Sequence, residues 1–171
     1  MKTSKLFIAL ICAVFSVQSY AGFLIEPYAG YGTIATTTDV PSDDNETEAG
    51  AFVGGRLGYS FLLVSAGIDY NTGSAGDYDR TSTSAFVGVD LPILLRFYGK
   101  YTFSSDLENS DNDFDYDFKS GYAVGVGFTG LPFVSLNLEA GAEKYEVEVL
   151  GQDYDVDAAN ILATVSLPLD F

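Results

Sequence analysis

Apolar and polar residues alternate along most of this chain with a period of two. The clearest example is the run 161–171, whose first register holds Ile161, Ala163, Val165, Leu167, Leu169 and Phe171. The second register is mostly polar and includes Thr164, Ser166 and Asp170. Such alternation places one face of a β-strand in an apolar medium and the other face in a polar one. Helical periodicity and helix caps are missing, so the pattern predicts an all-β fold.

Eight such runs occur, and their connections alternate between long and short. The runs span residues 23–33, 49–59, 62–71, 81–91, 93–103, 118–128, 133–145 and 161–171. Long polar loops, among them 72–80 and 104–117, follow the odd-numbered runs, and tight turns follow the even-numbered ones. An up-and-down barrel with both chain ends on the inner side requires this order. We therefore predict an eight-stranded antiparallel transmembrane β-barrel with short periplasmic turns and long extracellular loops.

The ionisable residues inside the runs fall on one register, which is also rich in glycine. They are Glu26, Arg56, Asp69, Asp90, Arg96, Lys100, Glu139 and Glu143. A cation in the middle of the lipid-facing register would cost about 2–4 kcal/mol, so we assign the charged register to the lumen. Because buried charges need partners, we expect a network of interior ion pairs in two layers. Glu26–Arg56 and Asp90–Arg96 are the first pairs expected, and the network would plug the lumen.

The first 21 residues have the three parts of a secretory signal. Lys2 and Lys5 precede the apolar run 6–17, and a small-x-small cleavage site at 19–21 precedes Gly22. The apolar run is too short to be a comfortable transmembrane anchor. We therefore expect residues 1–21 to be a cleaved signal peptide and residues 22–171 to form one barrel domain. The single cysteine of the chain would leave with the signal.

Composition narrows the function further. Without the two signal lysines the chain has 6 basic and 24 acidic residues, a balance that argues against nucleic-acid binding. The chain has no histidine, which excludes Ser-His-Asp and Cys-His catalysis and histidine-ligated zinc. No other catalytic constellation is recognisable, so we expect no enzyme activity, no cofactor and no metal. The acidic stretch 106–117 has Tyr116 where an EF-hand loop needs its glycine, so we expect a solvated loop rather than a calcium site.

Three further features carry a family resemblance. They are the opening Glu-Pro-Tyr-Ala-Gly-Tyr-Gly at 26–32, the glycine-rich inward register, and the terminal Phe171 on the apolar face. With the eight runs, they make residues 22–171 resemble the small outer-membrane β-barrel family that includes OmpA barrel domains and OmpX. The resemblance implies a monomer in the outer membrane of a Gram-negative bacterium, in contact with lipid and lipopolysaccharide. It also implies that the barrel-assembly machinery recognises the C-terminal strand, through Val165, Leu167, Leu169 and Phe171.

Two functions remain open from the sequence. The first is a structural or interaction barrel that has a plugged polar lumen and presents acidic extracellular loops. The alternative is a narrow channel for small or hydrophobic solutes. Filled layers of interior charge would favour the first, and a continuous interior gap would favour the second. The loops contain no motif that names a ligand.

Overall fold

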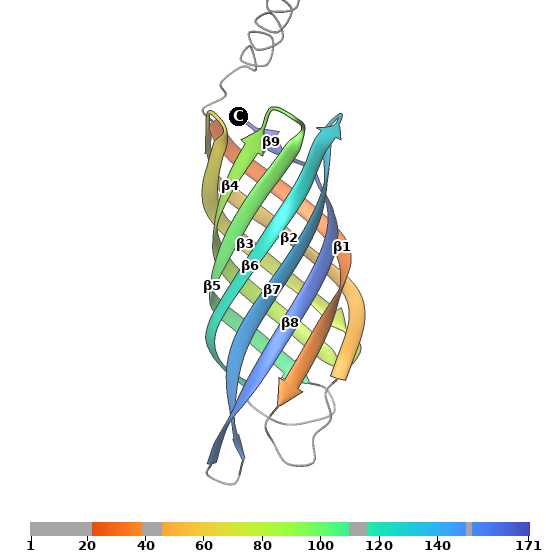
Figure 1. Cartoon of the computed structure of the whole chain (residues 1–171), viewed down its shortest axis with the longest axis vertical. Coiled ribbons are helices and arrows are strands. Elements are labelled where there is room, and N and C mark those ends of the chain that lie inside the picture. The colour runs from red at the N-terminus through yellow and green to blue at the C-terminus, as the bar shows by residue number, and fades with distance from the viewer. Residues whose placement is uncertain (1–21, 39–45, 110–115, 150–151) are drawn as a thin grey trace, which may run out of the picture.

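Eight long antiparallel strands form one closed sheet in the computed structural model, which describes residues 22–38, 46–109, 116–149 and 152–171 (Figure 1). The elements are β1 Gly22–Thr38, β2 Glu46–Phe61, β3 Val64–Ala75, β4 Tyr78–Leu91, β5 Leu95–Asn109, β6 Tyr116–Leu131, β7 Val134–Val149, β8 Gln152–Ser166 and the short β9 Leu169–Asp170. Each long strand pairs with its successor in the chain, and β8 returns to β1. The predicted all-β, eight-stranded up-and-down barrel is therefore confirmed. Within the described ranges, no helix is long and apolar enough to cross a membrane.

The stagger between strands sets their tilt. Starting at Glu26, the paired residues run through Arg56, Asp69, Ser84, Thr102, Gly121, Glu143 and Ala158. Ala158 then pairs with Thr36, so one circuit of the barrel returns to β1 ten positions beyond Glu26. For eight strands this stagger gives a tilt of about 40°, and it leaves a lumen narrow enough for side chains to fill.

The two ends of the barrel differ in construction. At one end, called the turn end, tight turns join β2 to β3, β4 to β5 and β6 to β7. At the other end, called the far end, the strands continue beyond the predicted runs. Residues 72–80, predicted to be a loop, are strand except for Gly76 and Asp77, so that prediction was wrong. The alternation continues there through the buried Ala75 and Tyr78, and Gly76 adopts the turn's left-handed φ of +56°.

Several sequence expectations fall partly or wholly outside the described residues. The proposed signal, 1–21, is one of them. The acidic segment 104–117 continues β5 to Asn109 and begins β6 at Tyr116, and residues 110–115 lie outside the described ranges. The expectation of a loop was therefore wrong for 104–109 and 116–117, where period-two alternation continues past two β-bulges, and it stays a prediction for 110–115.

Two β-bulges change which residues face the lumen near the far end. The pairing skips Phe103 in β5 and Lys119 in β6. Beyond the first bulge, Leu107 is buried, whereas Asp106 and Glu108 on either side of it are exposed. An unbroken alternation along β5 would have pointed these two acids into the lumen. The bulges thus keep carboxylates outside and apolar side chains inside.

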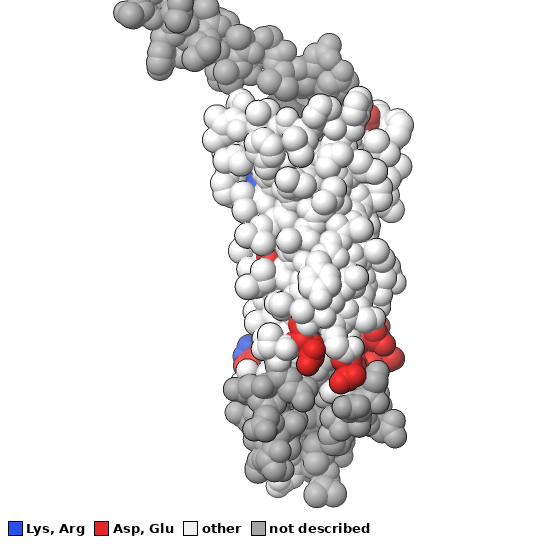
Figure 2. Space-filling model, turned by 90° about the vertical axis from the view of Figure 1, so that its right-hand side faces the viewer, with Lys and Arg blue, Asp and Glu red and all other residues white. Residues whose placement is uncertain are grey.

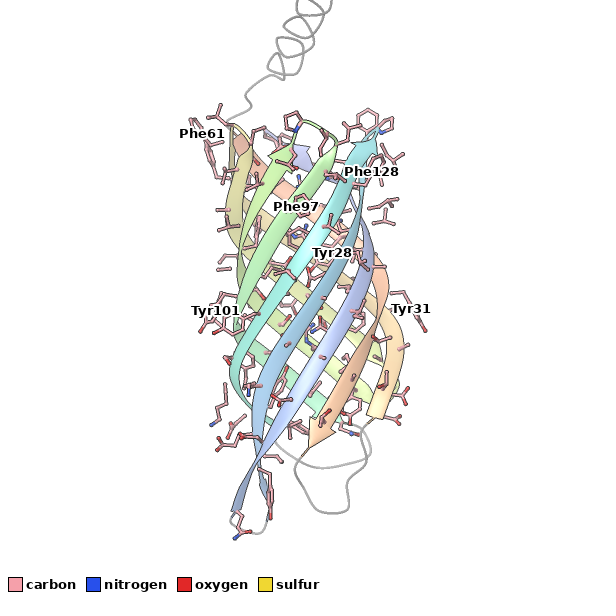
Figure 3. All side chains as sticks on the ribbon, in the orientation of Figure 1. Tyr28, Tyr31, Phe61, Phe97, Tyr101 and Phe128 are labelled. Carbon is pink, nitrogen blue, oxygen red and sulfur yellow. The ribbon has the colours of Figure 1, made fainter. Side chains whose placement is uncertain are left out.

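The outer surface is apolar from the turn end through the middle of the barrel. Its exposed side chains include Val53, Leu57, Ile68, Val87, Phe97, Val124, Leu138 and Ile161. A continuous apolar belt of this kind faces lipid in a transmembrane barrel. Exposed acids gather at the far end on the face shown in Figure 2. Tyrosines lie between the two regions; Tyr31 and Tyr101 mark this level on opposite sides of Figure 3.

Candidate functional site

Arg56 is the centre of a charged cluster inside the barrel. Its Nε donates to Asp69 Oδ2 at 3.0 Å and its Nη1 to Glu26 Oε1 at 3.4 Å. Its Nη2 lies 3.8 Å from Glu139 Oε2. These side chains come from β1, β2, β3 and β7, and all four are buried. Closure of the sheet is what brings them together, because Glu139 lies far from the other three in the sequence.

Two more cations complete this cluster. Arg96 donates from Nη1 to Glu26 at 2.8 Å and from Nε to Asp90 at 2.7 Å. Lys100 Nζ lies 2.6 Å from Glu139 Oε1 and 3.2 Å from Asp69 Oδ1. Seven of the eight predicted lumen residues therefore form one connected network, which we call the lower cluster: Glu26, Arg56, Asp69, Asp90, Arg96, Lys100 and Glu139. The structure thus brings together both Glu26–Arg56 and Asp90–Arg96.

Aromatic rings enclose the Arg56 guanidinium. Its Cζ lies 4.2 Å from the ring centroid of Tyr98 and 5.3 Å from that of Tyr28. Both rings rest on glycines, since a Cβ at Gly54 would lie 2.5 Å from Tyr28 Oη and one at Gly125 would lie 2.5 Å from Tyr98 Oη. Cation–π contacts of this kind strengthen when water is excluded. The inward glycines are therefore the space into which the rings around Arg56 fit.

The eighth predicted residue, Glu143, belongs to a second cluster nearer the far end. Arg80 donates to it from Nε at 2.8 Å and from Nη2 at 2.5 Å, a bidentate pair. The Tyr145 and Ser105 hydroxyls also donate to Glu143, at 2.6 and 3.3 Å. We call Arg80, Glu143, Tyr145 and Ser105 the middle cluster. Sequence reasoning missed Arg80 because it placed 72–80 in a loop; continued alternation past Tyr78 was the signal that would have found it.

Hydrogen bonds link the two clusters. Arg80 Nη1 donates to Asn71 Oδ1 at 3.1 Å, and Asn71 Nδ2 donates to Tyr28 Oη at 3.3 Å. The Tyr28 hydroxyl donates to Asp69 Oδ1 at 3.0 Å. The lower and middle clusters are thus joined in one hydrogen-bonded network, and mutual pairing of this kind offsets the cost of burying charge.

The interior beyond the middle cluster is mainly apolar. Its buried residues, called the upper cluster, are Ile34, Phe52, Ala75, Tyr78, Leu107, Tyr145, Val147, Val156, Ala158 and Leu162. Tyr145 belongs to both clusters, because its ring packs among these residues and its hydroxyl reaches Glu143. The lumen therefore contains charge toward the turn end and a hydrophobic core toward the far end.

Within the ranges that the structure describes, no group of three or more His, Cys, Asp or Glu side chains is placed to hold a metal ion. Each carboxylate of the lower and middle clusters instead lies against an arginine or a lysine. What this arrangement does is hold strands together across the lumen.

The C-terminal strand lies at the barrel seam. Val165, Leu167, Leu169 and Phe171 are all exposed on the outer face. After β8 ends, β9 pairs with Leu24 and Ile25 of β1, and Phe171 exchanges two backbone hydrogen bonds with Phe23, at 2.9 and 3.1 Å. The predicted assembly residues therefore share one lipid-facing stripe that reaches the turn end.

The closed eight-stranded sheet, its apolar belt and its paired interior charges define a transmembrane β-barrel of the small outer-membrane type.

Among solved structures the chain is similar to Neisserial surface protein A, with 15% identity over 88% of this chain and 99% of that chain, and a TM-score of 0.54. It is also similar to Ail, the attachment invasion locus protein of Yersinia pestis, whose structure was solved with the heparin analogue sucrose octasulfate. The identity is 12% over 85% of this chain and 99% of that chain, and the TM-score is 0.51. A third similar structure is the outer membrane protein AlkL, with 10% identity over 91% of this chain and 94% of that chain, and a TM-score of 0.50. These likenesses confirm the expected resemblance at the level of the fold. No protein-family model and no curated protein matches the chain.

Proposed function

We propose that this protein is an integral outer-membrane barrel of a Gram-negative bacterium with a structural or interaction role and a sealed lumen. It is exported with a cleaved signal peptide, residues 1–21, and acts as a monomer in lipid and lipopolysaccharide. The turn end faces the periplasm and the far end faces the outside. The barrel-assembly machinery recognises the outward stripe Val165, Leu167, Leu169 and Phe171.

The observation that carries the sealed lumen is the succession of three buried clusters along it. The lower cluster joins β1, β2, β3, β4, β5 and β7 through charges centred on Arg56. The middle cluster joins β4, β5 and β7, and the upper cluster fills the space beyond with apolar side chains. Ions passing through would have to break paired charges and then cross a hydrophobic core, and both steps are costly.

The far end supports the interaction role through its exposed charge. Asp79, Asp106, Glu108, Asp117, Asp155 and Asp157 are exposed there. The two exposed lysines of these strands are paired with acids, Lys119 with Glu146 at 3.1 Å and Lys144 with Asp157 at 3.4 Å. Such a surface attracts cationic partners and repels polyanions. The anionic ligand of the Ail structure is therefore a poor guide to what this chain binds.

An enzymatic role has no support from the interior, because the buried carboxylates are engaged in ion pairs rather than aimed at an open cleft. The alternative function, a narrow channel for small or hydrophobic solutes, requires the three clusters to leave a continuous path. The lower cluster argues most strongly against such a path, because its central side chains are enclosed: Arg56 is 3% exposed and Glu26 is 0% exposed.

Planar-bilayer recording of the purified, refolded chain tests the proposal. We expect no ohmic steps above the baseline of the bare bilayer, because paired charges close the lumen. A wide porin inserted in the same bilayer is the positive control for the apparatus, and heat-modifiable gel mobility shows that the sample is folded. Reproducible unitary steps from the folded sample would contradict the sealed lumen and favour the channel.

A further inference from the structure

The three turns at the turn end are made entirely of apolar residues. They are Leu62 and Leu63 between β2 and β3, Pro92, Ile93 and Leu94 between β4 and β5, and Pro132 and Phe133 between β6 and β7. Phe133 is 84% exposed, Ile93 66% and Leu62 60%. Turns that face water are built from Gly, Asn, Asp and Ser, and exposed apolar patches on this scale mark a contact surface.

The backbone of these turns makes the choice of residues more unusual. Leu62, Leu94 and Phe133 have φ values of 57°, 65° and 64°, which lie in the left-handed region that glycine and asparagine favour. Each turn therefore keeps a large apolar side chain at the position where a small or polar residue would relieve strain. A side chain retained against its own backbone preference must be stabilised by what surrounds it.

Two carbonyl groups of the turns accept hydrogen bonds from the neighbouring hairpin. The Leu63 carbonyl accepts from the Asp90 amide at 2.7 Å, and the Leu94 carbonyl accepts from the Thr129 amide at 2.8 Å. Each of these bonds runs from one hairpin to the next. Pro92 and Pro132 have no amide hydrogen to satisfy. These bonds lower the cost of placing the two carbonyls in lipid, which offers no hydrogen-bond partners.

The aromatic residues differ between the two ends of the apolar belt. Toward the far end the exposed aromatics are mainly tyrosines, Tyr31, Tyr70, Tyr101 and Tyr122, with Phe103 the exception, and tyrosine hydroxyls suit a lipid–water boundary. Toward the turn end they are mainly phenylalanines, Phe23, Phe61, Phe97, Phe128, Phe133 and Phe171, with Tyr59 the exception. Figure 3 shows Phe61 and Phe128 near the turn end and Tyr31 and Tyr101 well below them. Phenylalanine has no polar group to hold at an interface.

The height of the apolar belt also indicates that the turns belong to the lipid-facing surface. On β3, Tyr70 lies six residues beyond Val64, and on β5, Tyr101 lies six residues beyond Leu95. At a tilt of about 40° these stretches rise only about 15 Å, whereas an outer-membrane barrel needs an apolar band of about 25 Å. The strands alone are too short on this side of the barrel. Adding the apolar turns brings the band closer to the required height.

We propose that the three turns are immersed in the phospholipid of the periplasmic leaflet, so that lipid rather than water or a protein covers the turn end. This inference rests on the proposed orientation across the outer membrane. Of the carboxylates at this end, Asp90 is neutralised by Arg96 at 2.7 Å, whereas Asp170 is exposed and accepts a hydrogen bond from Ser60 Oγ at 3.0 Å. The barrel is then held asymmetrically, with its turn end sunk in lipid and its acidic far end projecting into water.

Single-tryptophan variants test this placement directly, because the chain contains no tryptophan. F133W and I93W report on the turn end, V124W on the middle of the belt, and D155W on the far end. Each variant is refolded into phosphatidylcholine vesicles whose acyl chains carry bromine at defined depths, and acrylamide serves as the aqueous quencher. I93W lies at an ordinary φ and replaces F133W if that variant does not fold.

We expect F133W and I93W to be quenched by bromine near the carbonyl end of the acyl chains and protected from acrylamide as well as V124W is. D155W should show the reverse. Acrylamide quenching of F133W and I93W equal to that of D155W would overturn the inference. If V124W is also open to acrylamide in a folded sample, the transmembrane proposal itself fails. If acrylamide reaches the turn-end tryptophans in vesicles but not in isolated cell envelopes, a protein partner covers the turn end. That result would refute the placement of the turns in lipid.

Discussion

Replacing Arg56 with leucine tests whether the interior charges hold the barrel together. The substitution removes the cation that lies 3.0 Å from Asp69, 3.4 Å from Glu26 and 3.8 Å from Glu139. Only Arg96 and Lys100 then remain in the lower cluster to balance the carboxylates of Glu26, Asp69, Asp90 and Glu139. Leucine also fills less of the space between the Tyr28 and Tyr98 rings.

The magnitude follows from leaving buried carboxylates short of a partner. Removing one member of a buried ion pair costs about 3–5 kcal/mol in other proteins, and we expect R56L to fall in that range. With a urea m-value of about 2 kcal/mol/M, a loss of about 4 kcal/mol lowers the unfolding midpoint by about 2 M. The assay is equilibrium unfolding of the refolded barrel in lipid vesicles, followed by heat-modifiable gel mobility.

Two comparisons separate charge from bulk. Arg56→Lys retains the cation but loses the two-pronged hydrogen bonding, so its loss should be smaller than that of R56L. Adding Glu139→Gln to R56L removes one unbalanced carboxylate, so that Lys100 pairs with Asp69 alone. The double variant should therefore regain about 1–3 kcal/mol of the unfolding free energy lost in R56L. An R56L midpoint within error of the wild type, or a double variant less stable than R56L, would refute the reasoning.

Three further substitutions test other parts of the structure. Leu107→Ala opens the upper cluster and should cost about 2–5 kcal/mol in the same unfolding assay, whereas Glu108→Ala on the exposed side should change stability by less than about 0.5 kcal/mol. Equal effects would show that the β5 bulge is misplaced. Gly125→Ala places a Cβ against the Tyr98 ring and should cost about 1–3 kcal/mol, and an unchanged midpoint would argue against that packing. Phe171→Ala should leave unfolding nearly unchanged, because its backbone bonds remain, but should lower the amount of barrel assembled in cells; undiminished assembly would exclude it as the recognition residue.

The sequence alone was sufficient to predict the strands and, in the middle of each strand, which side chains face the lumen and which face lipid. Strict alternation in the lipid-spanning part leaves little freedom, because a charged side chain facing lipid is expensive and a one-residue slip reverses every side chain on a strand. That constraint is why Glu26, Arg56 and Lys100 could be assigned to the lumen without coordinates. It also explains why the sequence predicts the pairing of β3 with β4 although it places their far ends, within 72–80, in a loop.

Beyond the lipid belt the same constraint weakens, and the errors begin there. A strand that projects into water has no hydrocarbon on its outer face, so polar residues outside a buried apolar register look like a loop in the sequence. Arg80 was missed for this reason, although its pair with Glu143 is bidentate. The interior of this region is in fact a hydrophobic core, as in a soluble barrel.

The sequence by itself determined the number of strands, their order and the polarity of each face within the membrane, because period-two alternation is a local property. Only the tertiary structure decided which charges meet and where the alternation is interrupted. Arg56 contacts Glu139 because the stagger around the closed barrel brings their strands to the same level. The bulges at Phe103 and Lys119 reverse the faces of β5 and β6 because the side chains beyond them must match neighbouring strands. Both facts depend on partners far away in the chain, and no window of sequence contains them.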